Sequence, residues 1–434
     1  MSLSSNPDHS TFSYYEVLLM KLSNLEKIIS LRRALHQHPE LSMQEKETMK
    51  ILQNFLRNNT SLEICVKDGW FYACKKSSAS VTSDAGNGGP IAFRADMDAL
   101  PVPETINLPH GSQNKGISHK CGHDGHCAVV CGLALELDSR ETDRDVYLIF
   151  QPGEEIGAGA RRCSELIREK GITEIYAMHN LGGYPEGSLV YRRGLTQPAS
   201  EGLRIRLTGK TSHASAPEKG NNPAGTIASI VQYALCASEL TGQELHDSVN
   251  PPAQTPLSDT KNKITPVIQN LSMRLCTITG IRLGGGDFGI SPGRGEICLT
   301  LRAELEEEMH AMEQSIISFA AQASAAAGLE MTYSVHDYFP ETRNHDDCLD
   351  RVLDAARENK IPAISMQELW RASEDFGHYL KICPGAMFYI GNGEDYAPLH
   401  TAEYDFNDRI IETAVNMFMG IIGIPSAGAG KLFK

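Results

Sequence analysis

Hydrophobic residues in the first half of the chain follow two alternating spacings. Apolar residues at every third or fourth position give way to short apolar runs, each followed by polar or small residues. The pattern predicts helices at 20–58, with a break at His38-Pro39, at 124–138 and at 158–170, and strands at 90–98, 145–155 and 174–180. Because strands alternate with helices, we expect an α/β fold, with a mostly parallel sheet and helices on both of its faces.

A different pattern begins near residue 198. It reads as a strand, a helix, two strands, a helix and a further strand. This β-α-β-β-α-β order is typical of a compact α+β unit of the ferredoxin-like kind. The first pattern resumes after residue 340. We therefore expect a catalytic domain in two parts, residues 15–197 and 341–424, with a second domain inserted at 198–340.

The composition excludes several classes of protein. Of the 434 residues, 41% are hydrophobic, which is enough for a core and excludes disorder as the dominant state. The 40 basic and 54 acidic residues give a net charge of −14, which argues against nucleic acid or an anionic membrane as the main partner. No run reaches the roughly 18 apolar residues of a membrane span, and the N-terminus does not resemble a signal peptide. The 11 scattered cysteines are typical of reduced thiols in a cytoplasmic enzyme.

The segment HKCGHDGH at 119–126 is the first candidate for metal chemistry. Cys121 and His123 are separated only by Gly122, which lets the backbone turn tightly. A thiolate and an imidazole this close can ligate one metal ion or form a pair. The alternative is a turn in which Asp124 caps a helix and the histidines have no shared role. The spacing does not match the CxxC arrangement of a structural zinc site.

Two adjacent glutamates, Glu154 and Glu155, follow a predicted strand in QPGEEIGAGA. Adjacent side chains leave the chain in different directions, so one carboxylate can bind a metal ion while the other faces a water molecule. The alternative is an acidic helix N-terminus, where the helix dipole favours glutamate. His179, at the edge of a predicted strand, and His400, in a later loop, are weak candidates when each is taken alone.

Taken together, five of these residues suit a dinuclear metal site. They offer one thiolate, one carboxylate and three imidazoles, from Cys121, Glu155, His123, His179 and His400. Five ligands exceed the need of one tetrahedral zinc ion but fit two ions that share a bridging ligand. Two ions about 3.5–4 Å apart can activate a water molecule and polarise a carbonyl group. A further carboxylate must then move a proton to a leaving amine, and Glu154 is the candidate.

Eight short motifs follow one another along the chain. They are LRRALHQHPELSMQE (31–45), FRADMDALP (93–101), HKCGHDGH (119–126), IFQPGEEIGAGA (149–160), MHNLGG (178–183), GKTSHASAP (209–217), SEDFGHYL (373–380) and PLHTAEYDF (398–406). In this order they resemble the M20 metallopeptidase family, in its aminoacyl-amidohydrolase branch. That branch includes enzymes similar to hippurate hydrolase, N-acyl-amino-acid amidohydrolase and the plant auxin-conjugate hydrolases. The resemblance covers about residues 30–422, nearly the whole chain.

The resemblance implies a role for each candidate residue. The five residues of the dinuclear set would be the metal ligands, with Cys121 as the bridge. Glu154 would be the general base and then the general acid. Asp98, otherwise a turn residue, would orient a ligand or the base. His213, otherwise a surface histidine, would stabilise the tetrahedral oxyanion. The two divalent ions would be zinc, manganese, cobalt or nickel, because the mixed ligands admit each of these.

The resemblance also implies that the inserted domain acts as a lid and a dimerisation surface, so we expect a homodimer. Two departures from the family pattern lie in this domain. Gly289, in GGGDFGISP, stands where the family has an asparagine that helps bind the substrate carboxylate, and PEKGNNP replaces the commoner P-H-x-x-x-D-P after His213. Since the metal ligands are intact, we expect the hydrolytic chemistry but not the standard substrate. The polar stretch at 244–264 is expected to be a surface loop that shapes the pocket or a subunit contact.

The sequence therefore predicts an M20-type metallo-amidohydrolase of linear amides. It would cleave the amide bond of a small-molecule substrate, an N-acyl amino acid or a related conjugate, into a carboxylic acid and an amine. One alternative is a dipeptidase or carboxypeptidase on the same dinuclear site. Another is a binding protein that has kept the fold without turnover, although binding alone does not require Glu154. No nucleic-acid or membrane partner is expected.

Overall fold

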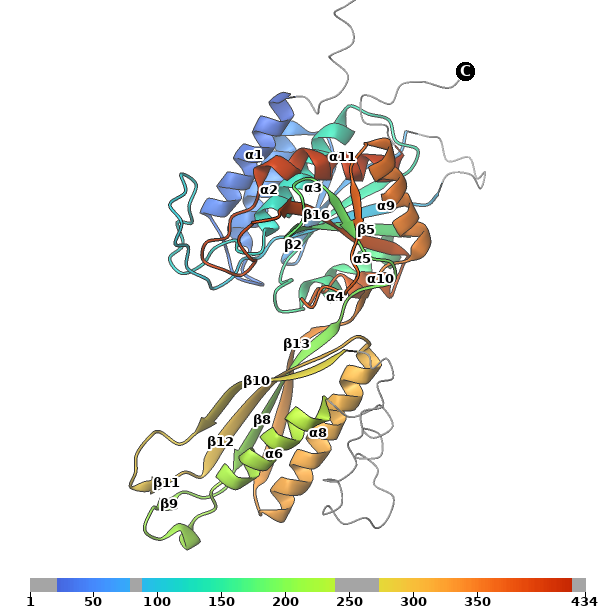
Figure 1. Cartoon of the computed structure of the whole chain (residues 1–434). Coiled ribbons are helices and arrows are strands. Elements are labelled where there is room, and N and C mark those ends of the chain that lie inside the picture. Colours follow the sequence, from blue (N-terminus) through green and yellow to red (C-terminus); the bar gives the residue numbers. More distant parts are fainter. Residues whose placement is uncertain (1–21, 79–87, 239–272, 424–434) are drawn as a thin grey trace, which may run out of the picture. The chain divides into compact units, whose positions relative to one another are not determined.

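The computed structural model describes most of the chain and divides it into two compact units (Figure 1). The described residues are 22–78, 88–238 and 273–423. The predicted surface loop at 244–264 lies outside them. Within the described residues, the first unit comprises the chain up to Gly194, Arg343–Glu368 and the chain from His378 onward, and the second comprises Leu195–Thr342 and Leu369–Gly377.

One sheet forms the centre of the first unit. Its strands are β1 (Glu63–Lys67), β2 (Trp70–Lys75), β3 (Ile91–Asp96), β4 (Val146–Gln151), β5 (Glu174–Gly182), β6 (Leu189–Tyr191), β15 (Ala363–Ser365) and β16 (Gly385–Gly393). The order across the sheet is β1-β2-β4-β3-β5-β16-β6-β15. The central strands β4, β3, β5 and β16 are parallel, whereas β2 and β6 pair antiparallel with their inner neighbours. This arrangement confirms the predicted α/β class.

Helices cover both faces of this sheet. They are α1 (Leu22–Gln37), α2 (Lys46–Asn59), α3 (His123–Asp138), α4 (Gly159–Cys163), α5 (Glu165–Lys170), α9 (Asp346–Glu358), α10 (Gly377–Leu380) and α11 (Ile411–Ile422). Figure 1 shows α1, α3, α9 and α11 on one side of the sheet, and α4 and α5 on the other. Because both faces are covered, a central strand needs apolar residues at successive positions. Every residue of β3 and β4 is buried, which fits the apolar runs in the sequence.

The single helix predicted at 158–170 is wrong in one detail, because the structure has two short helices there. Both α4 and α5 border on Ser164. The Ser164 hydroxyl donates to the carbonyl oxygen of Arg161 at 3.0 Å. A serine that bonds the backbone in this way competes with the regular helical pattern. The short strands of the sheet, such as β6 and β15, were also not predicted.

The parallel strands determine where the candidate residues lie. Since β3, β4, β5 and β16 point in one direction, the loops that follow them leave from the same edge of the sheet. Asp98 follows β3, the pair Glu154 and Glu155 follows β4, and His179 lies within β5. His400 lies in the loop after β16. The fold therefore gathers residues that are far apart in the sequence.

The second unit has the predicted β-α-β-β-α-β order. Its elements are β8 (Ala199–Thr208), α6 (Ala224–Ala237), β10 (Arg274–Leu283), β12 (Arg294–Ala303), α8 (Glu306–Ala326) and β13 (Glu330–Phe339). The strands form an antiparallel sheet in the order β10-β12-β8-β13. Leu203 and Ile205 of β8 share a core cluster with Met312 and Ile316 of α8. The inserted α+β unit is therefore confirmed as a fold.

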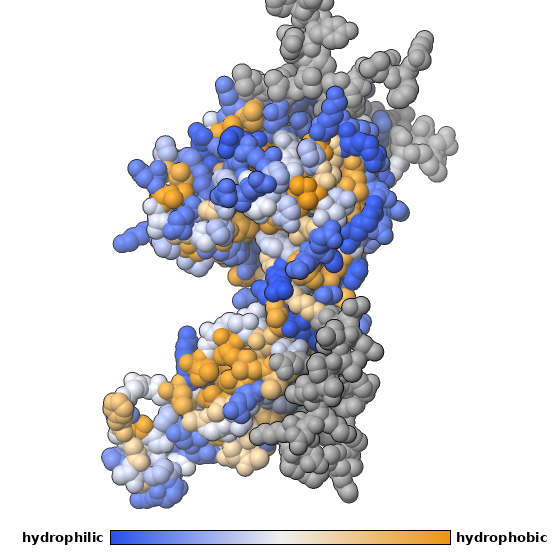
Figure 2. Space-filling view, viewed as in Figure 1, coloured by the Kyte–Doolittle hydropathy of each residue, from blue (hydrophilic) through white to orange (hydrophobic). Residues whose placement is uncertain are grey.

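Strand β10 lies at an edge of this second sheet and carries exposed apolar residues. Ile281 and Leu283, both in β10, are among the large hydrophobic residues exposed on the surface. Figure 2 shows apolar side chains gathered over the part of this unit where β10 and β12 lie. Among the described residues, no helix is long and apolar enough to cross a membrane.

Two buried side chains of α1 hold this helix to the loops around the candidate residues. Arg32 donates to Asp124 at 3.3 Å and to Asp405 at 2.8 Å. His36 lies one turn further along α1, with Nδ1 at 2.8 Å from Asp124 and Nε2 at 2.9 Å from Glu104. Burial disfavours a charged imidazole, but the bonds to Asp124 and Glu104 outweigh it and raise the pKa of His36 to about 9.

We expect His36 to make stability depend on pH between about 6.5 and 9. Because its pKa is higher in the folded state than the usual 6.5, its stabilising effect is complete below that pH and is lost as the pH rises through about 9. A shift of this size corresponds to about 3 kcal/mol. Thermal unfolding of the wild type and of His36→Gln at pH 6 and pH 9.5 measures the effect. The wild type should exceed the variant at pH 6 by a margin that shrinks at pH 9.5, and a constant margin would contradict the assignment.

Candidate metal centre

Five residues from four separate segments meet beyond the carboxyl edge of the first sheet. Cys121 Sγ lies 3.4 Å from His179 Nε2 and 3.3 Å from His400 Nε2. Glu155 Oε1 lies 3.8 Å from His123 Nε2 and 3.5 Å from His400 Nε2. The structure thus brings together all five residues predicted as metal ligands, and their role as ligands stays a prediction.

These donor atoms fit metal coordination. They form two groups that share Cys121, one with His123 and His179 and one with Glu155 and His400, and within each group the atoms lie within 4.8 Å of one another. Two ligands about 2.0–2.3 Å from one ion lie about 3.3–3.8 Å apart. The Cys121–His179, Cys121–His400 and Glu155–His400 distances, each within one group, fall in this range. His123 Nε2 and Glu155 Oε1 are buried and have no hydrogen-bond partner among the described residues. Since such atoms are costly to bury unpaired, a cation at each group would satisfy them.

Hydrogen bonds behind two of the rings leave Nε2 available in the cluster. His123 Nδ1 lies 2.9 Å from the carbonyl oxygen of Asp98, and His179 Nδ1 lies 2.8 Å from the carbonyl oxygen of Asn180. Because a carbonyl oxygen can only accept, Nδ1 carries the proton in both rings. Nε2 is then the lone-pair donor, which is the usual arrangement of a metal-binding histidine.

Asp98 fixes the backbone of the glutamate pair. Its Oδ1 accepts from the N–H of Glu154 at 3.1 Å, and its Oδ2 accepts from the N–H of Glu155 at 3.0 Å and from Ser42 Oγ at 2.7 Å. Burial disfavours the Asp98 carboxylate, but its bonds with His123 and Ser42 outweigh burial and hold the pKa of Asp98 below its usual value. Asp98 is therefore a buried anion that positions both the proposed base and a proposed ligand.

Acidic groups crowd the cluster, and this disfavours the charged forms of Cys121 and Glu155. Burial, together with the charges of Glu155 and Glu154, raises the pKa of the Cys121 thiol well above its usual value. Burial also raises the pKa of Glu155 to about 7, against the opposing effect of His123. A thiolate beside two carboxylates therefore requires added positive charge, and divalent cations supply it.

Two left-handed backbone positions allow the segments to approach. Gly122 has a φ of +103°, and a Cβ atom there would fall on Asn180 Oδ1 and lie 2.9 Å from the Tyr404 hydroxyl. His400 has a φ of 63°, and its N–H donates to the carbonyl oxygen of Lys120 at 2.7 Å. This hydrogen bond joins His400, in the last segment of the cluster, to the residue before Cys121.

Three buried residues at the centre were missed by the sequence analysis, namely Asp96, His126 and Asn180. His126 Nδ1 lies 2.7 Å from Asp96 Oδ1, and His126 Nε2 lies 2.7 Å from Asn180 Oδ1. With both ring nitrogens engaged, His126 supports the cluster rather than adding a ligand atom. The spacing of Asp96 and Asp98 was the available signal, since residues two apart in an extended segment share a face.

His213 belongs to the second unit and is not part of the group above. It lies in β9 (Ser212–His213), which pairs with β11 (Ile290–Ser291), and its ring is exposed. The N–H of Ser215 donates to His213 Nδ1 at 3.1 Å. Since Nδ1 accepts, Nε2 carries the proton and can donate a hydrogen bond.

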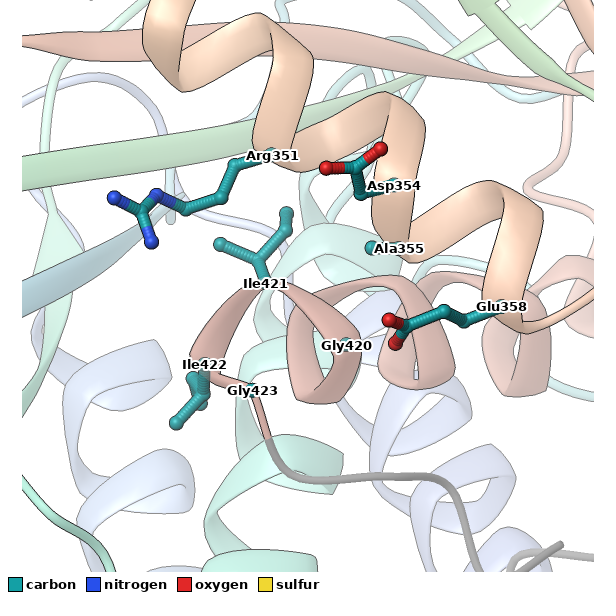
Figure 3. A pocket seen from close by; sticks show the side chains of 8 residues that line it. All are labelled: Arg351, Asp354, Ala355, Glu358, Gly420, Ile421, Ile422 and Gly423. Atoms are coloured by element: carbon teal, nitrogen blue, oxygen red, sulfur yellow. The ribbon is translucent and has the colours of Figure 1, made fainter. Parts of the chain in front are cut away.

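A cavity elsewhere in the first unit is lined by none of the candidate metal ligands. It has a volume of about 390 Å³ and lies between α9 and the end of α11. Figure 3 shows its lining residues, which are Arg351, Asp354, Ala355, Glu358, Gly420, Ile421, Ile422 and Gly423. None of them is a thiol or an imidazole, and none belongs to the cluster.

The sequence model of peptidase family M20/M25/M40 matches residues 92–423, well over half of the 434 residues. The chain belongs to this family. The resemblance inferred from the eight motifs is thereby confirmed. The range that matches the M20 model contains Asp98, Glu154, His213 and all five predicted ligands.

This M20 chain is similar to characterised proteins over most of its length. N-acetyl-L-cysteine deacetylase of Bacillus subtilis is 30% identical over 389 residues, which are 88% of this chain and 85% of that protein. Thermostable carboxypeptidase 2 of Saccharolobus solfataricus is 29% identical over 91% of this chain and 95% of that protein. The YXEP protein of Bacillus subtilis, a dinuclear metal binding peptidase from the M20 family, is 25% identical, with a TM-score of 0.71 over 93% of this chain and 99% of that chain.

We expect Gly122→Ala to lower the metal content of the purified protein. A side chain at this left-handed φ costs about 1 kcal/mol, and its Cβ would also displace Asn180 and Tyr404 from their present positions. Gly225→Ala is the matched control, because a Cβ there would meet nothing within 4 Å. Elemental analysis after dialysis measures bound zinc or manganese per chain. Equal metal content in the two variants would show that the turn at Gly122 is not required.

Proposed function

We propose that this protein hydrolyses the amide bond of N-acyl amino acids or related small amide conjugates. The products would be a carboxylic acid and an amine. The observation that carries the proposal is the convergence of two groups of possible metal ligands at one partly buried centre. Both groups contain the Cys121 thiol, and Glu154 lies beside them. The similarity to N-acetyl-L-cysteine deacetylase over 88% of this chain supports the substrate class.

We propose that the centre would hold two divalent metal ions, and that Cys121 would belong to both sets of ligands. His123 and His179 would complete one set of ligands, and Glu155 and His400 the other. When bound, the ions would act as Lewis acids that polarise the amide carbonyl group and lower the pKa of a water molecule. A thiolate with imidazole and carboxylate ligands admits zinc, manganese, cobalt or nickel.

Glu154 is the carboxylate outside these two ligand sets. It is buried beside them, with Oε2 at 3.8 Å from His123 Nε2, and Asp98 fixes its backbone N–H. Glu154 would accept a proton as the water oxygen attacks the carbonyl carbon. It would then deliver this proton to the amine nitrogen as the C–N bond breaks. Asp98 would act as a positioning residue for this transfer.

We propose that the second unit acts as a lid that brings His213 to the reacting carbonyl. The proton on His213 Nε2, held there by the Ser215 N–H, would be donated to the oxyanion. Gly289 lies beside this residue, because its carbonyl oxygen accepts from the N–H of Ala214 at 2.9 Å. It offers no side-chain amide to a substrate carboxylate. The neighbouring Phe288 is 99% exposed, and we propose that it favours an apolar substituent on the substrate.

A carboxypeptidase is the second candidate. The match to thermostable carboxypeptidase 2 covers 91% of this chain, and the match to the deacetylase covers 88%. A peptidase would use the same metal centre and Glu154, so only the substrate distinguishes the two functions. Parallel assays of N-acetyl amino acids and of dipeptides, with added divalent metal and with chelator, would separate them.

We further propose a cytoplasmic homodimer. The exposed edge strand β10, with Ile281 and Leu283, supports association through the second unit. None of the 11 cysteines, all of which lie in the described ranges, forms a disulfide, which supports a reducing compartment.

We expect Glu154→Gln to affect turnover and Glu155→Gln to affect metal binding. Glu154→Gln should lower kcat by about 10²–10⁴-fold while the metal content is kept, because it removes only the proton acceptor. Glu155→Gln should lower the metal content itself, because it removes a ligand. Elemental analysis and amide hydrolysis in metal-replete buffer test both variants. Near wild-type turnover in Glu154→Gln would refute its role as the base.

We expect His213→Ala to lower kcat by about 10²–10³-fold without loss of metal, as for other donors to an oxyanion. Ser334→Ala, on another exposed strand of the same unit, serves as a control for general effects on the second unit. His213→Ala should keep the wild-type thermal midpoint, since the His213 ring is exposed. An unchanged kcat would exclude His213 from the reaction.

A further inference from the structure

Two carboxylates lie in the apolar layer of the second unit, apart from the candidate metal centre. Glu201 belongs to the inward-facing row of β8, between Ala199 and Leu203, and is only 1% exposed. Glu313 lies on the inner face of α8 beside Met312 and is 6% exposed. The surrounding pattern would place an apolar side chain at both positions. Acidic residues are rarely buried unless a counter-charge or a metal ion is present.

His310 completes a group with these two carboxylates. Its Nδ1 lies 3.9 Å from Glu201 Oε2 and 3.6 Å from Glu313 Oε2, and its Nε2 lies 3.6 Å from Glu306 Oε1. These distances exceed those of hydrogen bonds. The ligand atoms of Glu201, His310 and Glu313 lie within 4.8 Å of one another. Glu306, His310 and Glu313 are spaced along one face of α8.

The group lacks a positive partner within the described part of the chain. Glu201 Oε1 is buried and has no hydrogen-bond partner among the described residues. Glu313 Oε2 accepts only a long bond of 3.4 Å, from Gln314. No lysine or arginine of the described ranges forms an ion pair with either carboxylate. Burial, with the charges of Glu313 and Glu306, raises the pKa of Glu201 to about 8.

A β-bulge lies directly opposite Glu201. Strand β13 pairs His336 with Gly202 and Phe339 with Ser200, and its register shifts between these pairs. Two residues of β13, Asp337 and Tyr338, therefore stand opposite the single residue Glu201. Asp337 has a left-handed φ of 47°. The ring of Tyr338 stacks on His310 at 5.8 Å with an angle of 6°. Bulges often redirect a side chain beside a functional site, and here Tyr338 holds the imidazole near the carboxylates.

We propose that Glu201, His310 and Glu313 bind a divalent transition-metal ion such as zinc. Two ligands about 2.1 Å from a tetrahedral zinc ion lie about 3.4 Å apart, and the distances from His310 Nδ1 to Glu313 and Glu201, 3.6 and 3.9 Å, are slightly longer. Zinc accepts both imidazole and carboxylate ligands, and three protein ligands leave a fourth position for water. The side chain of His310 is 45% exposed, which gives the ion a path from solvent. The bound ion would link α8 to β8 and stabilise the second unit.

Zinc binding by the full-length protein tests this proposal independently of catalysis. The protein is stripped with chelator, equilibrated with zinc alone, and analysed for zinc per chain in the wild type and in Glu201→Gln, Glu313→Gln and His310→Ala. The control is Glu307→Gln, which removes one exposed negative charge from the same helix. We expect the three site variants to bind one zinc ion fewer per chain than the wild type and the control. We also expect zinc to raise the thermal midpoint less in these variants.

The zinc count per chain is repeated in a double variant, His179→Ala with Glu155→Gln, which lacks two of the proposed ligands of the candidate metal centre. There, one zinc ion should remain and should be lost on adding Glu201→Gln. If Glu201 and Glu313 instead share a proton, the zinc count will not change in any variant, and the proposal is overturned. An equal loss in Glu307→Gln would overturn it as well. His310→Ala alters a partly exposed side chain and so keeps the test available if a buried variant fails to fold.

Discussion

The carboxylate of Asp98 accepts hydrogen bonds from two separate segments at once, and the candidate metal centre depends on this constraint. Asp98 follows β3, its acceptor oxygens hold the backbone that follows β4, and its carbonyl oxygen faces the ring of His123 at the start of α3. The bonds from Glu154 and His123 are buried, and a buried donor that loses its acceptor costs about 1–3 kcal/mol. One anion thus holds the backbone of both the proposed base and a proposed ligand.

The support continues outward from this anion in successive layers. His126, Asp96 and Asn180 form a buried chain of hydrogen bonds beside the cluster. Arg32 and His36 of α1 then hold Asp124, the neighbour of His123. This explains why motif LRRALHQHPELSMQE contributes no ligand and yet belongs with the others. A metal site needs such outer partners, because they fix the orientation of each ligand.

The sequence predicted the catalytic elements well, and for a physical reason. Central parallel strands consist of nearly continuous apolar runs, and ligands bind beside the loops that follow them. The sequence could therefore place Glu154 and Glu155 in such a loop without a structure. The short strands β6 and β15 have too few residues for a period, and the break at Ser164 depends on a single side-chain bond. Glu201 was missed because alternation predicts a strand but does not show which row of side chains faces inward.

The order of strands in the first sheet has a consequence for the nascent chain. Strand β16 lies between β5 and β6, and it is the last strand of the described chain to be synthesised (Figure 1). Until it emerges from the ribosome, β5 has no neighbour on that side and β6 has no antiparallel partner. At typical rates of translation, the roughly 200 residues between β5 and β16 take about 10–40 s to make. During that interval all strands and helices of the inserted unit are synthesised, while β5, without its neighbour β16, leaves an unpaired edge in the first sheet.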